Sequence, residues 1–128
     1  MTKWIFTLLF ILPIMVSAQK EIQLKRKYFG KYKGEIAGYN IDTGEKIMRV
    51  SSSAIYIEIS KNEISITIGN NKLKGSYEVM FKAQTYFLVD AEIEGQLATE
   101  RIIIYKRGRK VARDGMFPQP VTQLKKYK

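Results

Sequence analysis

The side chains that could carry chemistry in this chain are carboxylates, lysines, arginines and tyrosines, because the sequence contains no histidine and no cysteine. Without histidine the chain lacks the commonest general base, the commonest metal ligand and the usual partner of a nucleophilic serine. Ser–Lys and paired-carboxylate chemistry stay possible on composition, but few activated groups remain. We therefore predict that the protein is not an enzyme, with no catalytic residues, no cofactor and no metal site.

The first eighteen residues have the three parts of a secretory signal peptide, namely Lys3, an apolar run over 4–16, and Ser17-Ala18 before the expected cleavage point. The apolar run is too short to cross a bilayer comfortably. We expect residues 1–18 to be removed, the protein to be exported to the periplasm or the medium, and no integral membrane segment to remain. Because an exported chain without cysteine has no disulfides, its core must hold the fold alone.

The densest charge is the stretch KRGRKVAR, at residues 106–113. Residues 19–33 and 106–128 carry six and eight cations with one acid each, whereas residues 34–105 carry seven cations and ten acids. A basic cluster can bind nucleic acid, but here it forms the exposed tip of a predicted hairpin in a chain with an export signal. We predict no nucleic-acid partner. The alternative to a solvated turn is a basic patch that faces an anionic envelope surface.

The elements that must position these side chains are short strands, because apolar residues alternate with a period of two through most of the chain. Turn signals recur about every ten residues. They lie at 42–45, 60–63, 69–71, 82–85, 94–96 and 107–109. We predict an all-β fold, an antiparallel up-and-down meander of seven to eight strands that closes into a small barrel, with a β-sandwich as the alternative.

The register follows from pairing like with like, since a slip of one residue turns every side chain to the other face. Five turns of two or three residues satisfy this rule and set the pairing of the strands around them. The expected pairs are Ile59–Ile64 and Ile57–Ile66 around 61–62, Ile68–Leu73 and Ile66–Gly75 around 70–71, Phe81–Phe87 and Val79–Val89 around 83–85, Asp90–Arg101 around 95–96, and Ile104–Val111 around 107–108.

This register separates the acidic side chains into two groups. Glu100 points inward beside Arg113, and a buried carboxylate needs a partner, so the two should form an ion pair. The pair is either a structural closure of the barrel end or a polar anchor for a ligand headgroup. Outward, Glu63, Glu78 and Asp90 share one row, where we prefer a solvated surface neutralised by Arg101 over a calcium site.

The first predicted strand lies in YFGKYKGEI, at 28–36, where glycines between aromatics let a strand coil tightly, as barrel closure needs. With the meander that follows, the chain resembles the calycins, the lipocalin-like β-barrels. Gly30-Lys31-Tyr32 stands where lipocalins have Gly-x-Trp, and Arg113 matches the late arginine that packs over that aromatic. The resemblance implies a cavity for a small apolar ligand. The expected ligand-binding residues are Tyr28, Tyr32, Tyr77, Glu100 and Arg113.

One outward surface on the predicted register is apolar, which is unusual for a face in solvent. Its members are Met80, Leu88 and Ile103 in one row, and Tyr86 and Tyr105 beside Lys82 in the next. We expect residues 19–115 to form a single antiparallel β domain and residues 116–128 an extended basic tail, which Pro118 and Pro120 keep from becoming helical. The tail is the predicted cover of the apolar rows. The rival is an open patch that binds a second copy or a partner.

These observations leave two functions open. The leading one is non-enzymatic binding of a small apolar or amphipathic ligand inside the barrel, with an envelope component as a further possible partner. The alternative is a protein- or glycan-interaction module that works through an outer face of the sheet. A wide, partly empty interior would favour the first function, and a filled core with an apolar outer patch would favour the second.

Overall fold

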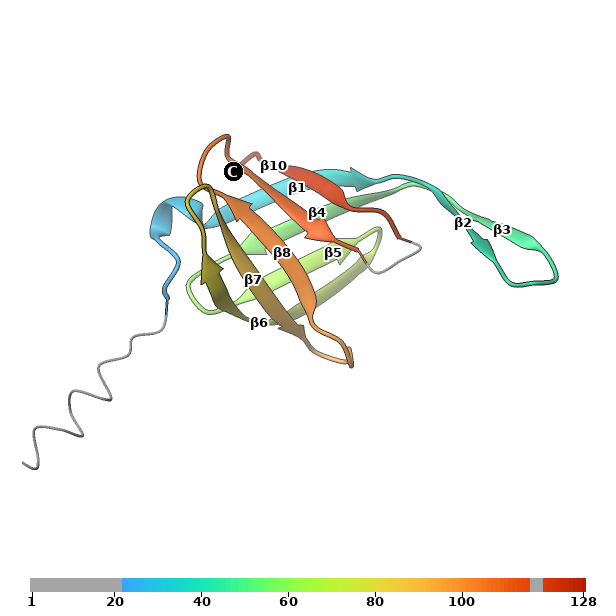
Figure 1. The fold of residues 1–128 in the computed structure, drawn as a ribbon, viewed down its shortest axis with the longest axis horizontal. Helices are drawn as coiled ribbons and strands as arrows, with labels where there is room; N and C mark the ends of the chain where they lie inside the picture. Colours follow the sequence, from blue (N-terminus) through green and yellow to red (C-terminus); the bar gives the residue numbers. More distant parts are fainter. Residues whose placement is uncertain (1–21, 116–118) are drawn as a thin grey trace, which may run out of the picture.

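The computed structural model describes residues 22–115 and 119–128, and the expected signal peptide at 1–18 lies outside them. One short 3-10 turn, η1 (Arg26–Tyr28), precedes a succession of strands (Figure 1). The strands are β1 (Gly30–Ile36), β2 (Tyr39–Asp42), β3 (Ile47–Val50), β4 (Ser53–Ile59), β5 (Ile64–Ile68), β6 (Asn71–Lys82), β7 (Tyr86–Ile93), β8 (Glu100–Tyr105), β9 (Lys110–Asp114) and β10 (Thr122–Lys126).

Eight of these strands form a closed barrel in the order β1-β10-β9-β8-β7-β6-β5-β4, and all neighbours are antiparallel. The predicted fold class is therefore confirmed as a closed meander barrel rather than a sandwich. β2 and β3 pair only with each other, as a two-stranded ribbon. The ribbon continues β1 and β4 and projects away from the barrel, at the end opposite η1 (Figure 1).

The barrel interior is filled with branched aliphatic and aromatic side chains, as the alternation of the strands predicts. Eighteen apolar residues form one buried cluster, each between 0% and 8% exposed. Isoleucines dominate it, because β-branched side chains pack well on a pleated surface. The least exposed large members are Tyr32, Ile55, Ile57, Ile64, Ile66, Val89, Ile102, Ile104, Val111 and Leu124.

Most of the predicted register is confirmed. The hairpin of β4 and β5 pairs Ile59 with Ile64 and Ile57 with Ile66. Around the later turns the predicted pairs also form, each on the face expected for it. These pairs are Val79–Val89, Asp90–Arg101, Ile102–Arg113 and Ile104–Val111.

The predicted turn between β5 and β6 was wrong by one residue, which shifts the pairing of the two strands by two. Ile66 pairs with Leu73 rather than Gly75, because the chain turns at Gly69 and Asn70, where Gly69 has a φ of 58°. Glycine adopts this left-handed conformation without steric cost. Since strand side chains repeat every two residues, the slip changed the partners and left every residue on its predicted face.

β6 carries two irregularities that alternation alone does not reveal. At Gly75 it approaches β7 so closely that a Cβ atom would overlap the carbonyl oxygen of Glu92. Between Val79 and Phe81 the register shifts at a bulge, so Phe81 pairs with Leu88. The predicted Phe81–Phe87 pair was therefore wrong: the extra residue of the bulge turns the Phe81 side chain outward, where it is 52% exposed.

The segment predicted as a covering tail is in part a strand of the barrel. Residues 122–126 form β10, which pairs with both β9 and β1 and closes the sheet. Its alternation buries Thr122 and Leu124, at 3% and 0% exposed, and the barrel therefore extends past residue 115. The tail prediction was wrong for 122–126, because an unpaired edge between β9 and β1 offers these backbone groups hydrogen bonds that a surface tail would lack.

Candidate functional site

Glu100 and Arg113 form the predicted ion pair at the barrel end near the β9–β10 connection. The Arg113 Nη2 atom donates to Glu100 Oε1 at 2.9 Å, and its Nε atom donates to Glu100 Oε2 at 3.0 Å. The Arg113 side chain is 7% exposed and the Glu100 side chain is 12% exposed. Nη1 donates to Gln119 Oε1. Each nitrogen of the guanidinium is thus engaged by the protein itself, which favours structural closure over a ligand anchor.

Thr122 completes this polar group from β10, directly across from Arg113. Its Oγ1 is buried and has no hydrogen-bond partner among the described residues. The Arg113 side chain therefore lies within a small polar cluster rather than beside Tyr32. The expected packing of Arg113 over Tyr32 was wrong, because Tyr32 faces Lys126, four positions along β10 from the residue that pairs with Arg113.

The hydroxyls of two of the three tyrosines predicted to bind a ligand form hydrogen bonds within the barrel. The Tyr32 hydroxyl donates to the carbonyl oxygen of Tyr28 at 2.7 Å, which ties η1 to β1. Burial raises the pKa of Tyr32 to about 12, while the nearby Arg109 opposes the shift and Tyr28 adds to it. The Tyr77 hydroxyl donates to the carbonyl of Ser60 at 2.6 Å, and burial raises its pKa as well.

Tyr28 plugs one end of the barrel from η1. Its ring meets that of Phe87 edge-on, with centroids 5.2 Å apart, and Lys106 Nζ lies 5.2 Å from the Phe87 centroid on the same end. Tyr28 is 7% exposed, so its side chain is buried beneath η1. Of the five residues predicted to line a ligand cavity, Glu100 and Arg113 lie together and Tyr28 and Tyr32 lie together, at different places in the barrel.

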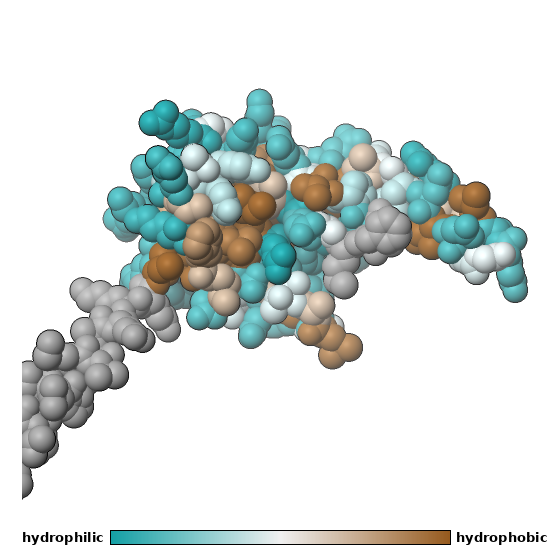
Figure 2. All heavy atoms as spheres, in the orientation of Figure 1, coloured by the Kyte–Doolittle hydropathy of each residue, from teal (hydrophilic) through white to brown (hydrophobic). Residues whose placement is uncertain are grey.

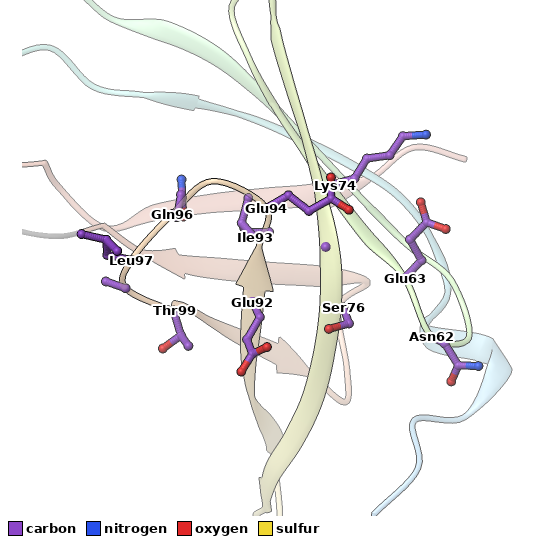
Figure 3. A pocket seen from close by; sticks show the side chains of 12 residues that line it. Asn62, Glu63, Lys74, Ser76, Glu92, Ile93, Glu94, Gln96, Leu97 and Thr99 are labelled. Carbon is purple, nitrogen blue, oxygen red and sulfur yellow. The ribbon is translucent and has the colours of Figure 1, made fainter.

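Two large hollows lie at the surface of the barrel. One of about 690 Å³ lies against the outer side of β6 and β7 and the loop after β7, and Glu92, Glu94 and Lys74 project at its walls (Figure 3). Another, of about 640 Å³, lies beneath the segment before η1, and its lining includes Tyr77, one of the predicted ligand-binding residues, with Leu24 and Val79 of the buried cluster. In the part of the chain that the structure describes, no group of carboxylates could hold a metal ion.

The predicted acidic row is only partly formed. Glu78 pairs with Asp90, Asp90 with Arg101, and Arg101 with Asp114. Glu63 does not join them, because the two-residue slip between β5 and β6 moves it toward Ser76. Arg101 lies between two carboxylates, as expected for a surface row that balances its own charge.

The apolar surface on β6–β8 is present and larger than predicted. Leu88 pairs with Ile103, and Tyr86 pairs with Tyr105. The bulge adds Phe81, whose ring centroid lies 6.5 Å from that of Tyr86. The run Val79-Met80-Phe81 breaks the alternation and was the one sequence signal of the bulge. We call the apolar outer face the set Met80, Phe81, Tyr86, Leu88, Ile103 and Tyr105.

The apolar outer face is open on the near side of the molecule, where apolar atoms gather over β6–β8 (Figure 2). Met80 and Phe81 are each 52% exposed, and the other four members are half-buried. Of the tail expected to cover them, at 116–128, residues 122–126 form β10 between β9 and β1, and residues 116–118 lie outside the described residues. The predicted cover is thus missing from the residues that the structure describes, and the predicted rival, an open patch, fits the geometry.

The loops at one end of the barrel are basic. We call this the basic end: residues 25–27, Lys61, Lys82, residues 106–109 and residues 126–128. The antiparallel order brings these separate segments together, and the Lys126 side chain donates to the Lys27 carbonyl at 3.0 Å. The sequence showed two basic termini, and their convergence on one end requires the barrel topology.

Comparisons with models of protein families, with curated proteins and with solved structures gave no match. The fold therefore defines the class: an eight-stranded, closed, antiparallel meander barrel with a projecting ribbon. Among the described residues, helices of the length and apolar character needed to cross a membrane do not occur.

Proposed function

We propose that this protein is an exported, non-enzymatic interaction module that works through the apolar outer face. The observation that carries the proposal is the contiguous row of Phe81, Leu88 and Ile103, which no segment of the described chain covers. A patch of this kind on a soluble domain commonly marks an interaction site. Export rests on the sequence of residues 1–18.

A ligand held inside the barrel has less support. The inward rows are filled by side chains with little exposure, and the polar groups at the Glu100–Arg113 end are taken up by one another. Interiors are packed at the density of organic crystals, so a filled barrel of this size has no room for a ligand without rearrangement. The likeness to calycins enters the proposal as topology and as Gly30-Lys31-Tyr32 on the first strand, without a calycin-type cavity.

Site-specific photo-crosslinking tests the proposal. A benzoylphenylalanine replaces Phe81 in the full chain, and the matched control replaces Tyr56, an outward aromatic residue of β4 that is 42% exposed. We expect adducts from position 81 in cells that export the protein, and none from position 56. The mass of each adduct identifies the class of the captured molecule.

Native mass spectrometry of the same purified chain supplies the opposing test. The proposal predicts the mass of the polypeptide alone. A small molecule retained in equal amount with the protein, together with equal crosslinking from positions 81 and 56, would contradict it and return the function to the barrel interior.

A further inference from the structure

The positive charge of the basic end is not neutralised by the surrounding loops. Among the described residues, the loops of this end carry one acidic side chain, Glu63, whereas the ribbon and loops of the opposite end mix both signs. The salt bridge that forms in the described part of the chain is Arg113–Glu100, which lies at that opposite end. The cations of the basic end are therefore available to an anionic partner.

The basic end and the apolar outer face share a border. Lys82 directly follows Phe81 at the end of β6, and the backbone N–H of Lys106 donates to the Thr85 carbonyl at 3.0 Å, which fixes the turn at 106–109 beside the β6–β7 loop. Lys110 Nζ lies 5.0 Å from the centroid of the Tyr105 ring. Cationic side chains thus rim an apolar surface on the side where β6 ends and β7 begins.

We infer that this corner of the barrel docks on an anionic lipid surface, with the cations at the phosphates and Phe81 and Met80 in the interfacial layer. The inference rests on the proposed function and names the partner of the same face. Lysine and arginine near an anionic leaflet each strengthen binding, and exposed apolar side chains add to it. Long cationic stems reach the headgroup level while the neighbouring apolar groups enter deeper.

The apolar component distinguishes lipid from other polyanions. An acidic polysaccharide or a nucleic acid would use the cations of the basic end, but it would leave Phe81 and Met80, each 52% exposed, without apolar contact. A lipid surface binds the cations through its phosphates and the exposed apolar side chains through its interfacial layer. It also accounts for the location of the bulge, which turns Phe81 outward next to Lys82.

Vesicle co-sedimentation of the full chain tests the inference. We expect binding to vesicles of phosphatidylcholine mixed with an equal amount of phosphatidylglycerol, and none to phosphatidylcholine alone. Binding should weaken between about 0.1 M and about 1 M salt as exposed charges are screened. Replacing Phe81 by serine should weaken it further at both salt concentrations, since the apolar contact is not screened.

Two triple variants with the same loss of charge form the decisive pair. Lys82→Gln, Lys106→Gln and Arg107→Gln together should weaken partitioning on the order of 100-fold, from about fivefold for each cation near an anionic surface. The control changes the exposed Lys46, Lys72 and Lys74 to glutamine, away from the basic end, and should change it little.

Equal losses in the two triple variants would overturn the inference, because binding would then follow net charge alone. Displacement from vesicles by a soluble acidic polysaccharide, with no effect of Phe81→Ser, would assign the basic end to polysaccharide instead. If vesicles do not bind and position 81 crosslinks to a protein, the lipid inference fails while the proposed function stands. If position 81 captures nothing and vesicles do not bind, both fail.

Discussion

Inside the barrel, charged side chains are paired and apolar side chains are buried, whereas at the corner where the basic end meets the apolar outer face both kinds stay exposed. Inside, every guanidinium nitrogen of Arg113 donates a hydrogen bond to Glu100 or Gln119, and the apolar residues of the core are 0–8% exposed. At the corner, Lys82 stays exposed next to Phe81, and Arg107 is exposed in the turn beside the β6–β7 loop. The pairing and burial inside the barrel stabilise the fold. The exposed charge and apolar surface at the corner contribute little to folding and fit a partner.

Removing one member of the buried ion pair should have the largest effect on stability. Arg113→Leu leaves Glu100 charged and unpaired in a nearly buried site, which should cost about 3 to 5 kcal/mol in the free energy of unfolding. The matched change at the open corner, Arg107→Leu, should cost less than about 0.5 kcal/mol. Urea denaturation of the two variants measures the contrast.

A double variant tests whether Glu100 and Arg113 depend on each other. Replacing Glu100 and Arg113 together by apolar residues should cost less than Arg113→Leu alone, since no buried charge is left without a partner. Purely additive effects in this double-mutant cycle would show that the two side chains do not depend on each other, and the closure role of the pair would be wrong.

A smaller loss should follow from truncating a core side chain of the closing strand. Leu124 is 0% exposed, so Leu124→Ala should destabilise the protein by about 2 to 5 kcal/mol, depending on how far the cavity collapses. Val121 is 64% exposed and precedes β10, and Val121→Ala should be close to neutral. Equal melting temperatures for the two variants would contradict the placement of residues 122–126 in the barrel wall.

Tyr32 gives the smallest expected effect, and it depends on pH. Its folded pKa of about 12 lies above the unfolded value of 10.0, so its contribution is fully present below pH 10 and is lost as pH rises toward 12. Tyr32→Phe removes the hydrogen bond to Tyr28 and should cost about 1 kcal/mol near neutral pH. The parent should lose more stability than the variant between pH 10 and pH 12, as followed by denaturant titration; parallel losses would contradict this.

The sequence predicted best where strong alternation and a short turn agree. The isoleucines of β4 and β5 admit one register, and it is the one observed. Between β5 and β6 the sequence Gly69-Asn70-Asn71 offers two adjacent turns, and a slip of two residues keeps every face, so alternation cannot choose between them. The Glu100–Arg113 pair could be predicted because two inward charges in neighbouring strands must meet.

Other features needed the closed barrel to become visible. Residues 122–126 alternate like a strand, but two prolines just before them favoured an extended tail, and only the open edge between β9 and β1 decides their role. The bulge beside Met80 depends on local twist, so the outward turn of Phe81 was missed. The ribbon of β2 and β3 was missed because its alternation looks like that of the barrel strands.

The most direct test that the apolar outer face binds a partner is tryptophan fluorescence from position 81. The sequence has a single tryptophan, Trp4, within the expected signal peptide. Phe81→Trp therefore adds a reporter at the open corner, and Tyr56→Trp adds one on β4 as a control, each read as the difference from the parent chain. We predict a blue shift at position 81 on adding anionic vesicles and no shift at position 56. Vesicle-bound protein with an unshifted spectrum at position 81, or the same shift at both positions, would contradict it.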